Sequence, residues 1–309
     1  MKNILLTISS CGVEDTEPIE VLEKAGYNVI FNPYKRKLCK EEVIELIVKH
    51  DPVGVIAGVE PLTAEVLSKA KGLRVISRCG VGLDNVDSEA ANNLGIQVYN
   101  TPDAPCLAVA ELAVALMLAA LRKINQVDQR LKSGNWFRPM GNLLSGKTVG
   151  IVGCGKIGSH LAKLLSGFEV ELIGYDNCLD EHQIINLCSL DGLLAKAEIV
   201  TLHVPYAENT KYIVDRDFLH KMRPDSILIN TARGGLVDEK ALYEAVKSGR
   251  IAGACLDTFE EEPYSGELTE LENVILTSHI GSYAIEARVN MEKEAALNLL
   301  KALHDDGVR

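Results

Sequence analysis

The chain has 309 residues, which is enough for about two domains of ordinary size. Hydrophobic residues make up 47% of it and charged residues 24%, a balance typical of a globular protein and too apolar for a disordered one. The formal net charge of −11 disfavours nonspecific attraction to nucleic acid or anionic lipid, so we expect neither as a partner.

We expect no targeting signal and no membrane span. The apolar stretch at 4–8 is shorter than the core of a secretory signal, and the run at 112–121 is about half the length of a bilayer span. The eight cysteines form no C-x-x-C pair and have no metal-like spacing from histidine. They indicate reduced, buried thiols in a cytoplasmic protein without a metal site.

Short β-rich runs alternate with helical patterns along the chain, which predicts an α/β fold with parallel sheets. The first series of expected strands is 3–8, 28–31, 54–57, 75–77 and 97–99. Among the helices between them, 41–49 places Val43, Ile44 and Ile47 on one face. This series predicts a first doubly wound unit.

One long helix is expected over 107–131, with an apolar stripe that is either core or a contact with a partner subunit. Beyond it, Trp136 is either an interface anchor or a cover over the edge of a core. A second series of strands follows at 148–152, 170–175, 199–203, 227–230, 252–256 and 274–276, before a final helix at 285–304. We therefore expect two α/β units.

A glycine-rich turn with the pattern G-x-G-x-x-G follows the strand at 148–152. Gly153 would permit the tight turn, Gly155 the approach of a pyrophosphate, and Gly158 the packing of helix on strand. Asp176 ends the next strand, close to the roughly 20-residue spacing of a ribose-binding acid. Because a carboxylate there repels a 2′-phosphate and no arginine follows it directly, we expect NAD rather than NADP.

Three ionisable residues, Arg233, Glu262 and His279, follow three successive strands of the second series. Ligands bind at the carboxyl ends of strands in an open parallel sheet. Hydride transfer to a 2-oxo acid would use Arg233 to hold the carboxylate and polarise the carbonyl. His279 would exchange a proton with the alkoxide, and Glu262 would orient the imidazole and favour its protonated form. Each of these three residues alone could have an ordinary structural role, but their placement after a dinucleotide-binding motif favours a catalytic one.

These motifs together resemble the NAD-dependent D-isomer-specific 2-hydroxyacid dehydrogenases. The resemblance rests on the glycine-rich turn with Asp176 and on the segments 231–238, 256–263 and 278–281. Segment 78–87 is most similar to the phosphoglycerate dehydrogenase branch, which serves serine biosynthesis. Ser278 departs from the proline usual before the histidine. Because the chain stops at Arg309, we expect a short form without a regulatory domain or serine-type feedback site.

The resemblance implies a Rossmann NAD-binding domain inserted into a flavodoxin-like substrate domain. Residues 1–100 and the C-terminal helix 285–309 would form the substrate domain. Residues 101–284 would form the NAD-binding domain, with the helix 107–131 making a homodimer.

The resemblance also implies site residues. The NAD site would be lined by Gly153, Gly155, Lys156, Ile157, Gly158, Asp176, His203, Pro205, Thr231, Ala232, Arg233, Asp257, His279 and Gly281. Asp257 would lie near the nicotinamide amide, and the loop from His203 to Pro205 would pass the adenosine. Backbone amides at Val81 and Gly82 would hold the substrate carboxylate, together with Arg233 and His279.

Arg78 bears on the choice of substrate. A cation beside the carboxylate-binding turn would suit 3-phosphoglycerate or 3-phosphohydroxypyruvate, the substrates we expect, yet Arg78 could equally pair with Asp84 or Asp87. A glyoxylate or hydroxypyruvate reductase would not require Arg78. A non-catalytic NAD(H)-sensing protein of the corepressor type is the alternative from another class, and a dehydrogenase of formate or phosphonate is a weaker one.

Overall fold

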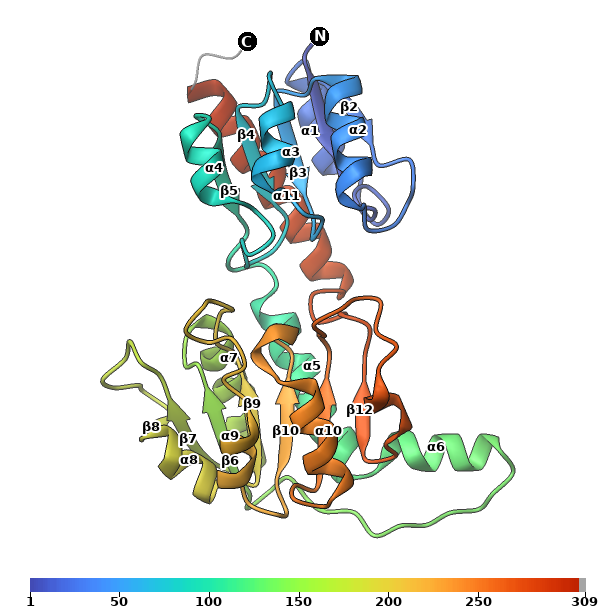
Figure 1. Ribbon diagram of the computed structural model, residues 1–309, viewed down its shortest axis with the longest axis vertical. Helices are drawn as coiled ribbons and strands as arrows, with labels where there is room; N and C mark the ends of the chain where they lie inside the picture. The colour runs from blue at the N-terminus through green and yellow to red at the C-terminus, as the bar shows by residue number, and fades with distance from the viewer. Residues whose placement is uncertain (306–309) are drawn as a thin grey trace. The chain divides into compact units, whose positions relative to one another are not determined.

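The computed structural model describes residues 1–305. The chain folds into two compact units, each a parallel β-sheet with helices on both faces (Figure 1). Unit 1 consists of Met1–Pro105 together with the C-terminal segment that begins at Ser282, and unit 2 consists of Cys106–Gly281. The predicted α/β class with two doubly wound parallel sheets is confirmed.

Unit 1 contains a five-stranded parallel sheet with the order β2-β1-β3-β4-β5. This is the flavodoxin-like order, in which the direction of winding changes between β1 and β3. The strands are β1 (Asn3–Leu6), β2 (Asn28–Phe31), β3 (Gly54–Ala57), β4 (Val75–Arg78) and β5 (Gln97–Asn100). All five were predicted. The central strand β3 is buried throughout, since helices cover both faces of the sheet.

The helices of unit 1 form two layers around this sheet. α1 (Glu17–Lys24) and α11 (Ile285–Asp305) pack on one face. The other face carries α2 (Lys40–His50), α3 (Ala64–Lys69) and α4 (Ser88–Asn93). α11 packs across β3, β4 and β5, so the last helix completes the core of unit 1. Leu299 of α11 reaches the backbone of β3, because Gly54 has no side chain to keep it away.

Unit 2 contains a seven-stranded parallel sheet with the order β12-β11-β10-β9-β6-β7-β8. The winding direction changes between β6 and β9, as in dinucleotide-binding sheets. The strands are β6 (Thr148–Val152), β7 (Glu171–Tyr175), β8 (Asn186–Leu187), β9 (Ile199–Leu202), β10 (Ile227–Asn230), β11 (Gly253–Leu256) and β12 (Val274–Leu276). Only β8 was not predicted; its two residues pair with the edge of β7 and carry no recognisable pattern.

The sheet of unit 2 also has helices on both faces. α5 (Cys106–Leu121) and α7 (Lys156–Leu165) cover one face. α8 (Leu190–Lys196), α9 (Arg216–Lys221) and α10 (Glu239–Lys247) cover the other. Short 3-10 turns stand at Ser166–Phe168, Gly234–Leu236 and Glu267–Glu270. Because the strands β6 to β12 are all parallel, their carboxyl ends and the loops that follow them lie at one edge of the sheet.

The prediction of one helix over 107–131 is wrong. The helix ends at Leu121, and a second helix, α6 (Ile124–Lys132), begins after Lys123. Lys123 adopts a left-handed backbone conformation with φ of 53°, which cannot continue a right-handed helix. The amide of Asn142 donates to the carbonyl oxygen of Leu121 at 2.9 Å, so a returning segment satisfies the helix end.

Two expectations about single side chains are settled by exposure. Trp136 is 80% exposed, so it does not cover the edge of a core within the chain. All eight cysteines are free thiols, but Cys39, Cys178 and Cys188 are exposed rather than buried as expected, because they lie in a helix cap and in loops.

Across residues 1–305, no helix is long and apolar enough to cross a bilayer.

Candidate active site

The glycine-rich turn follows β6 and leads into α7. Gly153 has a φ of 96°, and a side chain on it would lie 2.6 Å from the backbone of His203. A side chain on Gly158 would collide with the carbonyl oxygen of Gly153. Both positions therefore require glycine for the turn to close on the sheet.

Gly155 has a different role in this turn. It is the N-cap of α7, and a Cβ built on it meets nothing within 4 Å. The absence of a side chain here thus leaves space in front of the helix N-terminus rather than relieving a clash. Amides at such an end carry partial positive charge, so this space fits the pyrophosphate of a dinucleotide. Lys156 and Ile157 form the first turn of α7 directly behind it.

Asp176 joins the end of β7 to the glycine-rich turn. Its Oδ2 accepts a hydrogen bond from the amide of Cys154 at 2.8 Å, and its Oδ1 accepts one from the amide of Cys178 at 2.8 Å. The half-buried carboxylate is thereby fixed beside the glycine-rich turn. The loop after it is also anchored, because Ser159 of α7 contacts Nε2 of His182 at 3.0 Å.

Two further buried polar atoms fit a bound nucleotide. The hydroxyl of Thr231, after β10, and Nδ1 of His203, after β9, are buried without a hydrogen-bond partner among the described residues. Such atoms are costly unless a ligand or water satisfies them. Burial lowers the pKa of His203 to about 4, so its imidazole is neutral at physiological pH. Nε2 of this ring lies 2.9 Å from the Thr201 hydroxyl, and Pro205 follows in the exposed part of the same loop.

Arg233 stands in a tight loop after β10. The side chain of Asn230 shapes the loop by accepting from the amide of Ala232 at 3.0 Å and donating to the carbonyl oxygen of Arg233 at 2.8 Å. Nη1 of Arg233 donates to the Ala232 carbonyl at 2.8 Å. A side chain on Gly234 would overlap the backbone of Phe259, so glycine lets this loop pack against the one that carries Glu262.

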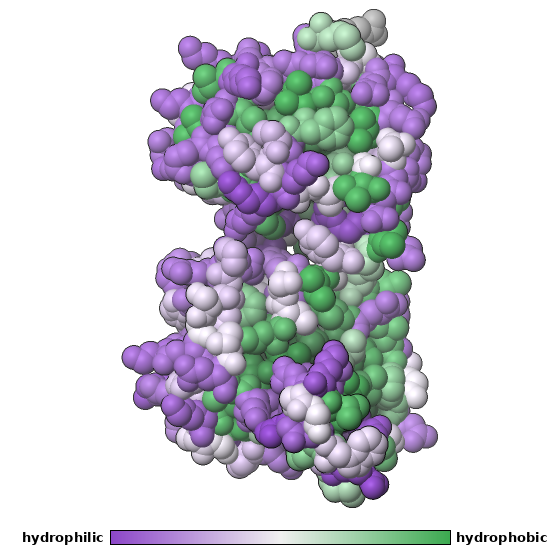
Figure 2. Space-filling model, turned by 90° about the vertical axis from the view of Figure 1, so that its right-hand side faces the viewer, coloured by the Kyte–Doolittle hydropathy of each residue, from purple (hydrophilic) through white to green (hydrophobic). Residues whose placement is uncertain are grey.

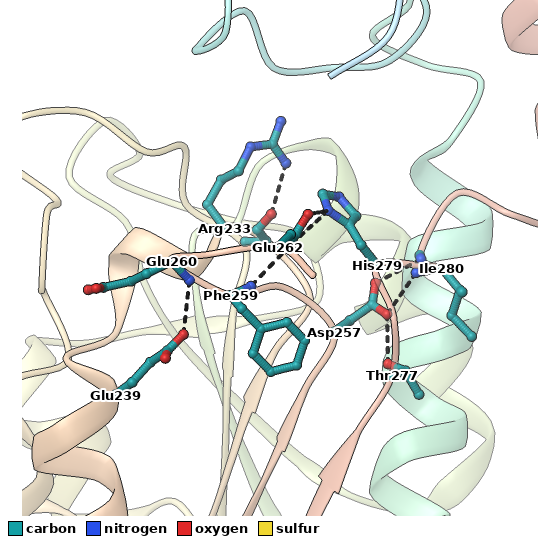
Figure 3. Close-up of polar contacts among 11 residues, drawn as sticks. Arg233, Glu239, Asp257, Phe259, Glu260, Glu262, Thr277, His279 and Ile280 are labelled. Carbon is teal, nitrogen blue, oxygen red and sulfur yellow. Dashed lines mark hydrogen bonds and ion pairs between the residues drawn. The ribbon is translucent and has the colours of Figure 1, made fainter. Parts of the chain in front are cut away.

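His279 and Glu262 form a direct pair. Nδ1 of His279 lies 2.9 Å from Oε2 and 3.0 Å from Oε1 of Glu262, and the amide of Phe259 donates to that carboxylate at 3.2 Å. Since a carboxylate accepts, Nδ1 carries a proton and the opposite nitrogen, Nε2, is left for a substrate. Figure 3 shows Arg233, Glu262 and His279 together on the loops beyond the strands.

Asp257, at the end of β11, holds the loop that bears His279. It is fully buried; Oδ1 accepts from the Thr277 hydroxyl at 2.6 Å and from the Ile280 amide at 2.8 Å, and Oδ2 accepts from the Gly281 amide at 2.8 Å (Figure 3). His279, between these anchors, has a φ of 56°, which is rare for a residue other than glycine. The sequence predicted Asp257 near the cofactor. It did not predict that Asp257 would accept hydrogen bonds from the loop that carries His279, or that Thr277 would be one of the donors, because no local pattern marks either contact.

The other predicted substrate residues lie in unit 1, after β4. Val81 is exposed, its carbonyl oxygen accepts from Asn100 Nδ2 at 2.6 Å, and Gly82 is half-buried. Arg78, the last residue of β4, is buried and donates from Nη1 to the carbonyl oxygen of Cys79 at 2.9 Å. Asp87 is the N-cap of α4, and its side chain accepts a hydrogen bond from the Ala90 amide. The predicted site residues therefore form two groups. Arg233, Glu262 and His279 lie together in unit 2, and Arg78 lies with the 80–82 turn in unit 1.

Comparison with known proteins identifies the class. Residues 114–281 match the family model of the D-isomer specific 2-hydroxyacid dehydrogenase, NAD binding domain. The chain belongs to this family, and unit 2 carries its NAD-binding domain, so the predicted nicotinamide dinucleotide cofactor is confirmed at the level of the family.

Individual relatives bear different names. The chain is 39% identical to D-3-phosphoglycerate dehydrogenase of Archaeoglobus fulgidus over 93% of its own length and 56% of that protein's. It is 40% identical to hydroxypyruvate reductase of Thermotoga maritima over 85% of its own length and 88% of that protein's. The crystal structure of TT0316 protein from Thermus thermophilus superposes with a TM-score of 0.89 at 35% identity, covering 98% and 97% of the two chains. The chain spans about half the length of the two D-3-phosphoglycerate dehydrogenases from Archaeoglobus fulgidus and Methanocaldococcus jannaschii that it matches.

Proposed function

We propose that this protein is an NAD-dependent dehydrogenase that interconverts a small D-2-hydroxy acid and its 2-oxo acid. The observation that carries the proposal is the His279–Glu262 pair, at 2.9 Å, on the same sheet edge as Arg233 and the glycine-rich turn. An acid–base residue, a carboxylate-binding cation and a dinucleotide turn are the parts that this reaction needs.

Each residue has a defined role in the proposed reaction. NAD, when bound, supplies the two-electron acceptor or donor. Arg233 binds the substrate carboxylate through its planar guanidinium and polarises the neighbouring carbonyl. His279 donates the proton at Nε2 to the developing alkoxide and takes it back in the oxidative direction. Glu262 holds Nδ1–H and so fixes which nitrogen faces the substrate.

The proposed cofactor is NAD rather than NADP. The carboxylate of Asp176 would repel a 2′-phosphate, and the loop 177–185 after it contains no lysine or arginine. The proposed contacts are the amides of the turn at Gly153, Gly155 and Gly158, the start of α7 at Lys156 and Ile157, and the loops that hold His203, Pro205, Thr231, Ala232, Asp257 and Gly281.

Two substrates have support. The names of two D-3-phosphoglycerate dehydrogenases among the relatives, from Archaeoglobus fulgidus and Methanocaldococcus jannaschii, favour 3-phosphoglycerate and its oxidised form, 3-phosphohydroxypyruvate. The Thermotoga maritima relative, of whose length the chain covers 88%, is named hydroxypyruvate reductase, which favours an unphosphorylated acid. In either case we propose that the amides of Val81 and Gly82 bind the substrate carboxylate.

The role of Arg233 is testable by comparing two arginine variants. Arg233→Ala should abolish turnover while NADH still binds, because Arg233 holds the acid and not the phosphates. Arg223→Ala is the matched control, since Arg223 is exposed and paired with Asp225 in the same unit. Loss of NADH binding in folded Arg233→Ala protein, or full activity, would contradict the assignment.

We also propose a cytoplasmic homodimer formed through unit 2. Trp136 and Met140, 80% and 89% exposed, lie with Leu131 and Leu143 on the segment from α6 to β6. Figure 2 shows apolar side chains gathered on the side of unit 2 from which α6 projects. Light scattering should give a dimer for the wild type and a shift toward monomer for Trp136→Ser, but not for Val13→Ser in unit 1. A monomeric wild type would contradict the proposal.

A further inference from the structure

The loop 177–185 follows Asp176 at the end of β7 and leads to β8. A half-buried histidine of this loop, His182, was not among the predicted site residues, and the proposed reaction does not use it. Its Nε2 lies 3.0 Å from the hydroxyl of Ser159 in α7, the helix that follows the glycine-rich turn. His182 therefore connects two segments that flank the proposed ribose acceptor.

The hydrogen bonds around His182 all run in one direction. The backbone amides of Ile184 and Ile185 both donate to Nδ1 at 3.2 Å, so Nδ1 carries no proton. In a neutral imidazole the proton is then on Nε2, which donates to the Ser159 hydroxyl. That hydroxyl donates in turn to the carbonyl oxygen of Cys154 at 3.1 Å. A continuous set of hydrogen bonds thus leads from the loop to the glycine-rich turn.

Cys154 is the residue at which these bonds meet Asp176. Its carbonyl oxygen accepts from Ser159, and its amide donates to Oδ2 of Asp176 at 2.8 Å. The other carboxylate oxygen, Oδ1, accepts from the amide of Cys178 in the loop, also at 2.8 Å. The carboxylate is therefore held at one oxygen by the glycine-rich turn and at the other by the loop that His182 ties to that turn.

An apolar contact anchors the end of the loop beside the same turn. Gly174 of β7 has no side chain, and a Cβ built on it would lie 2.5 Å from Ile185 Cγ2 and 2.6 Å from Cys154 Sγ. Ile185 is 2% exposed and Cys154 is 1% exposed. The loop and the turn thus pack over one position of β7. Because this packing already brings them together, the hydrogen bonds of His182 form with little further loss of chain entropy.

An alternative role for His182 is to bind the 2′-phosphate of NADP. It is the only residue of 176–185 that can become a cation, because this segment contains no lysine or arginine. Its contacts argue against that role: Nε2–H is directed at Ser159, and a proton on Nδ1 would face two amide donors. The neighbouring acids Asp180 and Glu181 would also repel a phosphate. Both ring nitrogens therefore serve contacts within the chain.

We infer that His182 is a positioning residue for the cofactor, which together with Ser159 holds the loop 177–185 against α7 and keeps Asp176 in place for the adenosine ribose. This inference rests on the proposed dehydrogenase function and adds to it a residue that acts through Asp176. A loop that is ordered before binding spares the cofactor the entropy of ordering it. The effect should appear in the affinity for NADH and not in the chemical step, because the contacts of His182 lead to the glycine-rich turn and to Asp176.

The test measures binding of NADH and of ADP-ribose, which contains the adenosine ribose but no nicotinamide. His182→Ala and Ser159→Ala should each weaken both ligands by about three- to tenfold, the effect of one lost hydrogen bond. With hydroxypyruvate, KM for NADH should rise by the same factor while kcat is unchanged. Gln183→Ala, in an exposed neighbour, is the control and should bind as the wild type does. Unchanged NADH affinity in folded His182→Ala, or weaker NADH binding with unchanged ADP-ribose binding, overturns the inference.

A double variant shows whether the two residues act as one link. His182→Ala combined with Ser159→Ala should bind NADH no more weakly than the single variants, because either change breaks the same link. Effects that multiply overturn the inference. A loss of NADPH affinity in His182→Ala that exceeds the loss of NADH affinity would assign the ring to phosphate binding and also overturn it. These results leave the dehydrogenase function standing, whereas a wild type that binds no NADH overturns both.

Discussion

His279 and Glu262 come from different loops, after β12 and β11, yet the imidazole Nδ1 lies within 3.0 Å of both carboxylate oxygens. This arrangement orients the ring more firmly than a single contact would, because two acceptors constrain both its direction and its tilt. It also leaves Nε2 as the nitrogen that exchanges the proton. The proposed chemistry depends on this pair more than on any other contact.

Removing the acid–base residue should stop catalysis without affecting the cofactor. His279→Ala is expected to lower kcat by about 10²- to 10⁴-fold, the usual contribution of a general acid. NADH affinity, measured by protein fluorescence, should change by less than about threefold, since the imidazole binds no phosphate. An active His279→Ala protein would contradict the assignment.

Removing only the orienting partner should have a smaller effect. Glu262→Gln keeps the volume but cannot accept from Nδ1–H with both atoms, so kcat should fall by at least about tenfold. Glu261→Gln removes an exposed neighbour in the same acidic run and should leave kcat unchanged. Equal activity of the two variants would show that Glu262 does not position His279.

Two glycine variants should separate folding from cofactor binding. Gly158→Ala forces a methyl group onto the Gly153 carbonyl oxygen and should destabilise the protein by about 1–3 kcal/mol. Gly155→Ala meets no neighbour within 4 Å, so the melting temperature should stay constant while NADH binding weakens at least about tenfold. The reverse pattern, a destabilised Gly155→Ala that binds NADH normally, would refute the proposed phosphate site.

Cofactor selectivity should depend on Asp176. Asp176→Ala removes the ribose acceptor and the bond to the Cys154 amide, so NADH should bind about tenfold or more weakly while NADPH loses less. Asp180→Asn changes an exposed acid of the same loop and serves as the control. An unchanged ratio of NADH to NADPH affinity in Asp176→Ala would contradict the predicted preference for NAD.

His203 should make stability depend on pH. Its folded pKa of about 4 lies below the ordinary value of 6.5, so its contribution is complete above pH 6.5 and is lost as the pH falls toward 4. The loss should be at most about 3 kcal/mol. Urea unfolding at pH 7 and pH 4.5 should show a smaller decrease for His203→Gln than for the wild type. Equal decreases would exclude His203 as the source.

Local patterns sufficed for much of the fold and site. Alternating apolar runs located β1 to β7 and β9 to β12, and the spacing of Gly153, Gly155 and Gly158 marked the dinucleotide turn. These features depend on residues close together in the chain. Arg233, Glu262 and His279 could be grouped because each follows a strand of one parallel sheet.

What escaped prediction depends on contacts between distant segments. Thr7 and Glu60 follow different strands, β1 and β3, and the Thr7 hydroxyl donates to the Glu60 carboxylate. Asp257 matters because three donors of the 277–281 loop converge on it, and the end of α5 at Leu121 accepts a hydrogen bond from Asn142, which lies about twenty residues further along the chain. No local pattern in the sequence records such pairings.

The most direct test of the account follows NADH absorbance with purified wild-type protein and hydroxypyruvate, and then determines the configuration of the glycerate formed. We predict NADH loss that matches the glycerate produced, a product of the D configuration, and no reaction with His279→Ala. Tight NADH binding without turnover of hydroxypyruvate, glyoxylate, pyruvate or 3-phosphohydroxypyruvate would contradict the dehydrogenase function and favour a nucleotide-sensing protein.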